Sequence, residues 1–142
     1  MSPTIRFLSA TFLILALSPG IRLAAQTFSS YEPPKNIGSP VNSAKNDFAP
    51  AISPDGSYMI YNSNRHGKYQ DLYITYLKNG TWSQPEPMTK INSPYNDETP
   101  FLSADGTILL FSSDRDGSIE MPKDDRNQIR VSFDLYWSKR VN

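Results

Sequence analysis

The sequence predicts an all-β protein made of two similar, four-stranded antiparallel sheets, and three observations predict it. The chain repeats itself at an offset of 50 residues, each copy alternates short apolar segments with tight-turn sequences, and several of these segments are apolar on both sides. A fixed period of this size is typical of architectures in which each unit buries its surface against its neighbours.

The repeat is in register over residues 42–67 and 92–117, where 11 of 26 positions are identical without a gap. Residues 71–73 (Asp-Leu-Tyr) recur as residues 134–136 at an offset of 63, so 13 additional residues have entered the second copy after Gly117. The predicted organisation is a signal peptide (1–25), an N-terminal segment that contains a possible outer strand (26–40), a first repeat (41–90) and a second repeat (91–142) with an insertion at 118–132.

Each copy contains an Asp-Gly turn between two apolar segments. We expect Asp55 and Gly56 in the first copy, and Asp105 and Gly106 in the second, to be structural turn residues, because glycine adopts positive φ freely. An Asn-Gly hairpin turn is expected at 79–80. The predicted strands are 49–53, 58–63, 71–77 and 81–83 in the first copy, and 100–103, 108–113 and 133–138 in the second.

Alternation within the strands distinguishes between all-β architectures. Tyr58 and Ile60 point to one face of their strand and Met59 and Tyr61 to the other, and residues 108–111 show the same pattern. Antiparallel strands that are apolar on both faces belong to sheets packed between other sheets. Radially stacked four-stranded sheets meet this requirement, so the prediction is two β-propeller blades, a partial propeller.

The same residues carry a family resemblance. The order Asn-Ser, Asn-Asp, Pro, Ser-Pro-Asp-Gly, Ile-Tyr-x-Ser-x-Arg-x-Gly and Asp-Leu-Tyr in the first copy resembles the TolB-type, WD40-like β-propeller repeat of bacterial cell-envelope proteins, and the second copy resembles it too. The resemblance covers about residues 41–138. It implies a propeller fold and a platform for protein interactions rather than a particular chemistry.

Two repeats do not close a propeller, which has four to eight blades. The chain is therefore expected either to be a fragment of a longer propeller protein or to assemble with copies of itself. The second copy ends at its third strand, and residues 27–38 fit the slot that residues 81–90 occupy before the second repeat, so the segment near 28–33 is a candidate outer strand for a neighbouring molecule. Some apolar residues are expected to lack partners within one chain, because these four cannot all find them there: Tyr58, Ile60, Leu109 and Phe111.

The first 25 residues predict export. Arg6 gives a positive start, residues 7–17 are apolar and uncharged, and Leu-Ala-Ala at 23–25 suits cleavage, which favours a secretory signal peptide over an uncleaved anchor. Removing Arg6 and Arg22 leaves a mature chain of 117 residues with 12 basic and 14 acidic groups. A periplasmic, outer-membrane-associated or extracellular location is expected, without a transmembrane span in the mature chain.

Composition excludes several kinds of site. The chain has no Cys and a single His, His66, which removes thiol nucleophiles, thiolate metal sites and multi-histidine metal sites. The balance of 14 basic and 14 acidic residues argues against nucleic acid as a partner. The acidic segment 114–120 lacks the ligand spacing of a calcium loop. No catalytic residue, metal or cofactor is expected.

The candidate interaction rim combines the Asn-Asp segments, the loops that follow the second strands and the insertion. Arg65 and Arg115 recur in register, which favours a structural ion pair or carbonyl contact within each repeat. The rim residues are Asn46, Asp47, Arg65, His66, Asn96, Asp97, Arg115, Asp124, Asp125 and Arg126.

The sequence thus predicts a non-enzymatic, exported protein-binding or scaffold module of the bacterial cell envelope, with envelope proteins or copies of itself as partners. Two alternatives remain at this stage. One is carbohydrate recognition or glycoside hydrolysis, which would need two facing carboxylates. The other is a fragment of a longer propeller protein without independent activity.

Overall fold

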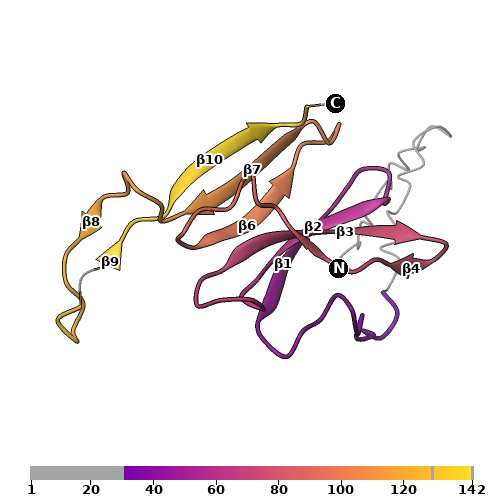
Figure 1. Ribbon diagram of the computed structural model, residues 1–142, viewed down its shortest axis with the longest axis horizontal. Coiled ribbons are helices and arrows are strands. Elements are labelled where there is room, and N and C mark those ends of the chain that lie inside the picture. Colours follow the sequence, from indigo (N-terminus) through magenta and orange to yellow (C-terminus); the bar gives the residue numbers. More distant parts are fainter. Residues whose placement is uncertain (1–30, 129, 142) are drawn as a thin grey trace, which may run out of the picture. The chain divides into compact units, whose positions relative to one another are not determined.

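The computed structural model describes residues 31–128 and 130–141, and every regular element in this part of the chain is a β-strand (Figure 1). The predicted signal peptide and residues 26–30 lie outside the described residues. Lys35–Asn142 form one compact unit. The strands are β1 (Asp47–Ile52), β2 (Tyr58–Ser63), β3 (Asp71–Lys78), β4 (Thr81–Trp82), β5 (Glu86–Pro87), β6 (Asp97–Leu102), β7 (Ile108–Ser113), β8 (Glu120–Met121), β9 (Arg130–Val131) and β10 (Asp134–Lys139).

The first sheet is an antiparallel meander in the order β1-β2-β3-β4, and β5 also pairs with β3. A two-residue turn joins β3 to β4, with Leu77 opposite Trp82. Asn79 and Gly80 both have positive φ, 52° and 76°, as the tightest hairpin turn requires. The hairpin predicted from Asn-Gly is confirmed.

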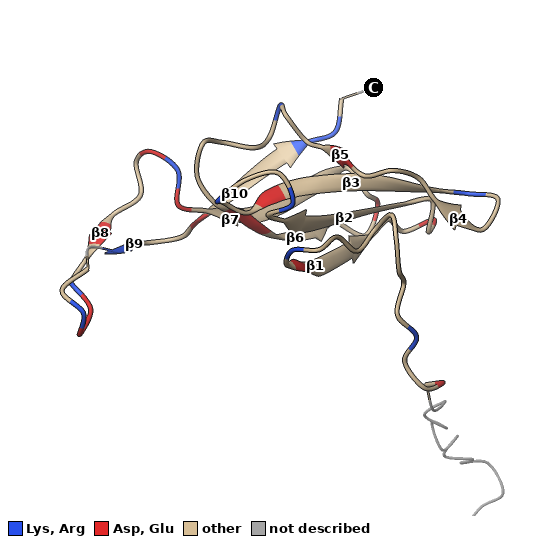
Figure 2. Ribbon diagram, turned by 60° about the horizontal axis from the view of Figure 1, so that its bottom comes forward, with Lys and Arg blue, Asp and Glu red and all other residues tan. Residues whose placement is uncertain are grey.

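The second sheet has the order β10-β7-β6, so its three strands correspond to β3, β2 and β1 of the first. The all-β, antiparallel prediction is thereby confirmed. In place of the short loop before β3, the second repeat carries the insertion, in which β8 and β9 form a separate two-stranded hairpin that projects from the sheet (Figure 1). Figure 2 shows that charged residues lie mainly in loops and at strand ends, including this hairpin.

The Asp-Gly turns have the predicted geometry. Gly56 and Gly106 have φ values of 72° and 68°, and the N–H of each donates to the carbonyl of the serine three residues earlier at 2.8 Å. The Asp55 carboxylate accepts hydrogen bonds from the Ser53 hydroxyl at 2.7 Å and the Ser57 N–H at 3.0 Å. Asp105 accepts the equivalent bonds in the second repeat. Both turns are therefore closed by the aspartate as well as by the backbone.

The first strand of each repeat, β1 or β6, begins earlier than predicted. Each of these strands contains a bulge that the sequence did not reveal, and pairing with the next strand already begins before the bulge. The pairing register shifts between Phe48 and Ala51 in β1, and between Glu98 and Phe101 in β6. Ala49 has a φ of 52°, and Thr99, 50 residues later, has 51°. A bulge disrupts the ladder locally while pairing continues on both sides of it. The Asn-Asp segments thus lead directly into paired strand.

The main core lies between the two sheets and corrects one expectation. Tyr58, Ile60, Leu109 and Phe111, which were not all expected to find partners within the chain, are all buried and pack into one cluster with Leu72. The face of the first sheet that carries Tyr58 and Ile60 packs against the face of the second sheet that carries Leu109 and Phe111. These faces do not correspond to each other in the repeat, because the offset of 50 residues places the counterparts of Tyr58 and Ile60 on the other side of β7. The two repeats therefore stack in the same direction rather than face to face as mirror images. A smaller cluster of Val41, Met59, Tyr61 and Tyr73, with Trp82 against it, lies on the other face of the first sheet.

The first sheet is covered on both faces along its central strand β2, whereas the second sheet is covered on one face, so the expectation of two doubly covered sheets is wrong for the second. All six residues of β2 are buried, whereas β10 alternates between half-buried and exposed positions. The exposed face of the second sheet carries Phe101, Leu110, Leu135 and Trp137, and the last two are 82% and 67% exposed. We call these four residues the open face.

Candidate interaction surface

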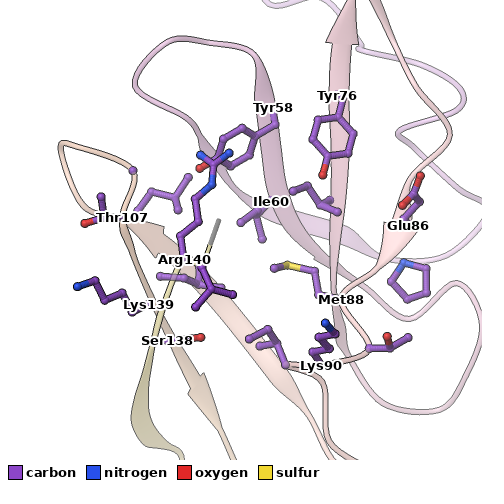
Figure 3. Close-up of a pocket in the computed structure, with 18 residues that line it drawn as sticks. Tyr58, Ile60, Tyr76, Glu86, Met88, Lys90, Thr107, Ser138, Lys139 and Arg140 are labelled. Carbon is purple, nitrogen blue, oxygen red and sulfur yellow. The ribbon is translucent and has the colours of Figure 1, made fainter.

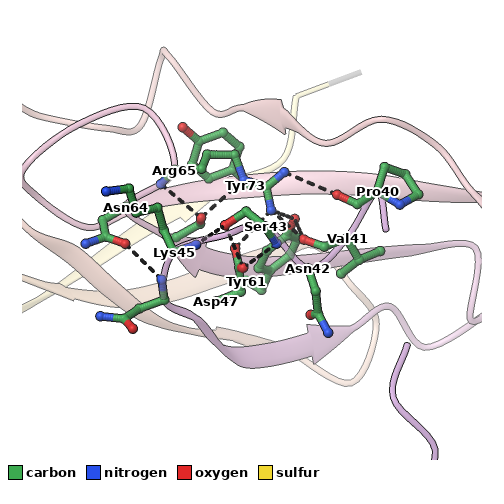
Figure 4. A network of polar contacts seen from close by, with 12 residues as sticks. Pro40, Val41, Asn42, Ser43, Lys45, Asp47, Tyr61, Asn64, Arg65 and Tyr73 are labelled. Carbon is green, nitrogen blue, oxygen red and sulfur yellow. Dashed lines mark hydrogen bonds and ion pairs between the residues drawn. The ribbon is translucent and has the colours of Figure 1, made fainter. Parts of the chain in front are cut away.

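Each repeat holds an arginine–aspartate pair in the same place, between the start of its first strand and the end of its second strand. Arg65 Nη2 lies 2.9 Å from Asp47 Oδ1, and Arg115 Nη2 lies 2.6 Å from Asp97 Oδ1. The Asp97 side chain is completely buried. Figure 4 shows the first of these networks, with Arg65 reaching from the end of β2 across to the segment before β1.

The two pairs share most of their contacts, and Arg65 donates in addition to the Pro40 carbonyl and the Tyr61 hydroxyl. In the first repeat, Arg65 Nε donates to the Ser63 hydroxyl at 3.1 Å, and Nη2 donates to the Val41 carbonyl. The second Asp47 oxygen accepts from the Ser43 N–H at 2.6 Å and the Ser43 hydroxyl at 2.8 Å.

In the second repeat, Arg115 donates to the Ser113 hydroxyl at 3.0 Å and the Ile91 carbonyl at 3.0 Å. Ser93 supplies the same two donors to Asp97, at 2.6 and 3.0 Å. Each guanidinium thus ties the segment preceding a repeat to the end of its second strand. The expectation of a structural ion pair and carbonyl contact for both arginines is confirmed.

Aromatic rings complete each network. The guanidinium carbon of Arg65 lies 5.5 Å from the centre of the Tyr61 ring and 5.0 Å from that of Tyr73. The corresponding distances from Arg115 are 5.1 Å to Phe111 and 4.6 Å to Tyr136. Such cation–π contacts stabilise a partly desolvated guanidinium. Burial raises the pKa of Tyr61 to about 12.

The electrostatics of Asp47 favour its charged form. Burial alone would raise its pKa, but hydrogen bonds from Ser63, Ser43 and Arg65 outweigh that effect, and the pKa lies below its usual value. A carboxylate that accepts several hydrogen bonds and faces a guanidinium stays ionised. The pair therefore serves as a permanent structural link rather than as an acid–base group.

The candidate rim thus divides into interior and surface residues. Asp47, Arg65, Asp97 and Arg115 belong to the two networks and present little surface to a partner. Asn96 is half-buried, where its side chain accepts from the Gln70 N–H at 3.1 Å and its amide donates to Asp114 at 2.9 Å. The remaining rim residues are exposed, except that Asp124 is half-buried: Asn46, His66, Asp124, Asp125 and Arg126.

His66 is exposed but is not isolated. Its Nδ1 lies 2.9 Å from the Tyr73 hydroxyl, and the two rings are 5.8 Å apart. Burial and the nearby Asp97 charge raise the pKa of Asp71, while His66 acts in the opposite direction. The sequence missed these contacts because the partners come from β3 and from the second repeat.

A groove of about 860 Å³ opens between the two sheets at the end opposite the arginine networks (Figure 3). Its floor is apolar, with Ile60, Ile74 and Leu109 among the residues that line it. Lys139 and Arg140 lie at its edge, and the guanidinium carbon of Arg140 is 5.6 Å from the centre of the Tyr58 ring. The sequence did not predict this groove, because it depends on how the two repeats stack.

The two turn aspartates come together beside this groove. Asp55 and Asp105 line one small cavity of about 130 Å³ with Arg140. The Ser53 hydroxyl, the Ser57 N–H and the Ser57 hydroxyl lower the pKa of Asp55 to about 2, and Ser103 and Thr107 do the same for Asp105. Both groups are ionised near neutral pH, whereas glycoside hydrolysis needs one carboxyl group that holds a proton. This pair is therefore unsuited to that chemistry.

The outer edge of β10 differs most from its counterpart in the first repeat. On β3, the Leu72 carbonyl accepts from the Met88 N–H at 2.9 Å, and β5 pairs with Tyr73 and Ile74. In the described part of the chain, no strand pairs with the corresponding edge of β10. This edge and the open face are continuous, because Leu135 and Trp137 belong to both.

Comparisons with known proteins add no assignment: no protein-family model and no curated protein sequence matches the chain. Within residues 31–128 and 130–141, no group of three or more acidic or histidine side chains is arranged to hold a metal ion. The same residues contain no helix of the length and hydropathy needed to cross a membrane.

Proposed function

We propose that the chain is an exported, non-enzymatic β-propeller-repeat protein that binds other proteins as a scaffold module of the bacterial cell envelope. In this proposal the two sheets are propeller blades, each packed in the same sense on the next. Export rests on the N-terminal signal sequence, and the envelope setting on the resemblance to TolB-type repeats.

The observation that carries the proposal is the open face of the second sheet. Phe101, Leu110, Leu135 and Trp137 form a row of exposed apolar residues on one sheet, next to an unpaired strand edge. Contiguous exposed apolar surface on a folded protein is typical of an interface, and an open edge pairs readily with another strand. The equivalent face of the first sheet is covered by a sheet, so a protein surface is the kind of partner that fits.

A pair of variants tests this function. The mature chain, Trp137→Asp and an exposed control, Lys78→Ala, are immobilised and exposed to envelope extracts of the native host, and the bound proteins are identified and quantified. The proposal expects a protein that binds the unaltered chain and the Lys78 variant but not the Trp137 variant. Retention of the same proteins by all three chains would overturn it.

Glycan recognition remains a second candidate because tyrosine and cationic side chains line the groove. Tyr58, Tyr76 and Arg140 lie at one end of it (Figure 3). Binding of a glycan that is lost in Tyr76→Ala and retained in Trp137→Asp would favour this candidate over protein binding.

A further inference from the structure

Leu72 and Leu135 occupy the same position in the two repeats but have opposite environments. Leu72 is 0% exposed and Leu135 is 82% exposed. The difference does not lie in their own strands, because β3 pairs with β2 as β10 pairs with β7, in the same register. It lies in what covers them: Leu72 packs against Leu109 and Phe111 of the second sheet, and the segment that follows the first repeat closes the outer edge of β3.

The Asn92 side chain closes that edge by making the two hydrogen bonds that a neighbouring strand would otherwise make. Its side-chain Oδ1 accepts from the Leu72 N–H at 2.9 Å, and its Nδ2 donates to the Leu72 carbonyl at 3.0 Å. An amide side chain offers a donor and an acceptor together, so it satisfies both backbone groups of one residue. Just before Asn92, β5 places Glu86 opposite Ile74 and Pro87 opposite Tyr73.

The chain contains a second segment of this kind, before its first repeat. Asn42 stands 50 residues before Asn92, and both close the same turn: the Asn42 N–H donates to the Gly38 carbonyl, and the Asn92 N–H donates to the Met88 carbonyl, each at 2.9 Å. No strand of the described chain runs beside residues 36–42, and the Asn42 amide donates to Asn36 at 3.0 Å in an exposed contact. We call residues 36–42 the N-terminal clasp.

We propose that the N-terminal clasp of a second copy of this chain closes the open edge of β10. The pairing repeats what residues 86–92 do on β3. Asn36 of one copy lies opposite Trp137 of the other, and Ile37 lies opposite Tyr136. The Asn42 side chain bonds the N–H and carbonyl of Leu135. This inference rests on the proposed protein-binding function and names its partner.

The contact joins two different surfaces, so a pair of copies keeps one free clasp and one free edge. Such head-to-tail contacts generate a ring if the rotation between copies closes and an open filament if it does not. Main-chain pairing supplies the affinity, as in other cases where an extended segment adds to a sheet edge. In this assembly the Leu135 N–H and carbonyl gain the partners that those of Leu72 have.

Disulfide trapping tests the register directly, because the natural chain has no cysteine. Two single-cysteine chains, Asn36→Cys and Trp137→Cys, are mixed at tens of micromolar under mild oxidation. Opposed antiparallel residues have Cα atoms about 4.5–5.5 Å apart, which a disulfide spans. The matched control replaces Trp137→Cys by Leu110→Cys, on the same face but one strand further from the edge.

The expected result is a cross-linked dimer from Asn36→Cys with Trp137→Cys, and at least about tenfold less from Asn36→Cys with Leu110→Cys. The double variant N36C/W137C should give a ladder of larger species. Equal cross-linking in both mixtures, or none in either, would overturn the proposal.

A second measurement keeps the native tryptophan. Light scattering on the mature chain should show association that rises with concentration, and Asn42→Ala should weaken it about tenfold through the loss of two hydrogen bonds. Lys45→Ala is the control, since Lys45 is exposed and lies outside both the clasp and the candidate rim. A well-folded monomer at tens of micromolar, or equal association of both variants, would overturn the proposal. If self-association fails while Trp137→Asp still loses a host protein, the proposed function stands and this inference falls.

Discussion

At the scale of single residues, the arginine–aspartate pairs explain why Asn-Asp and Ser-x-Arg recur 50 residues apart. Asp97 accepts from Ser93 and Arg115, and Arg115 also holds the Ile91 carbonyl. Additional hydrogen bonds to both members make a buried ion pair tolerable, and removing one member leaves the other charge without compensation. The repeated residues are thus fixed by structure rather than by a ligand.

Asp97→Ala should lower the free energy of unfolding by about 3 kcal/mol or more, because it leaves the Arg115 guanidinium without its buried partner. Urea denaturation of the mature chain measures the change. Arg126→Ala is the control: the Arg126 side chain is 78% exposed, so its pair with Asp124 should contribute little. Equal destabilisation by both variants would contradict the structural role given to Asp97.

Two turn glycines provide a second comparison. Valine at Gly56 or Gly106 should cost at least about 1 kcal/mol, since a β-branched residue resists positive φ. Gly106 should be the more sensitive, because a Cβ there would lie 3.2 Å from Pro54 Cδ, whereas nothing lies within 4 Å at Gly56. Thermal unfolding ranks the variants. Unchanged melting temperatures in both would show that positive φ is not required.

At the scale of elements, the Asp-Gly turns give the fold a defined response to acid. The folded-state pKa of Asp55 and of Asp105 is about 2, below the ordinary value of 3.8, because hydroxyl and N–H donors stabilise the carboxylate. A group with a depressed folded pKa contributes stability that is present above its unfolded pKa and is lost as pH falls through the folded pKa.

The stability of the unaltered chain should therefore fall between about pH 4 and pH 2, and the double variant D55N/D105N should show a shallower fall over this range. Urea midpoints at a series of pH values measure it. Parallel curves for the two chains would mean that other carboxylates govern acid unfolding.

The β8–β9 hairpin is an element that the fold does not need. Its strands pair only with each other, and Ile119 and Met121 are exposed. Replacing residues 118–133 by Lys-Tyr-Gln, the loop of the first repeat, should leave the free energy of unfolding within about 1 kcal/mol of the original. Circular dichroism and urea denaturation check this. Loss of folding would assign the hairpin a structural role.

The elements also show where sequence reasoning succeeds and where it fails. Asp-Gly and Asn-Gly encode their turns locally, so both turns and the strands beside them were predictable. The bulges at Ala49 and Thr99 were not, because neither residue type favours positive φ and the neighbouring strand imposes it. Burial of Tyr58 against Leu109, and the groove beside them, depend on the direction in which two repeats stack, which no single segment specifies.

At the scale of the whole molecule, the two sheets share one core, and the second sheet also has an exposed apolar face. Leu72, Leu109 and Phe111 lie in the same cluster between the sheets, while Leu135 and Trp137 face outward. The folded state of a single chain therefore depends on the contact between repeats, and its outward face is available to a partner.

Leu72→Ala should cost about 2–5 kcal/mol, because it removes a fully buried side chain from the shared core, whereas Leu135→Ala should change the stability of the monomer by less than about 0.5 kcal/mol. The two tryptophans report the sheets separately, since Trp82 belongs to the first and Trp137 to the second. Measured in W137F and W82F backgrounds, Leu72→Ala should shift both fluorescence transitions together, because the two sheets share the main core. A shift of the Trp82 transition alone would show that the second sheet folds independently and that the repeats are joined only by their linker.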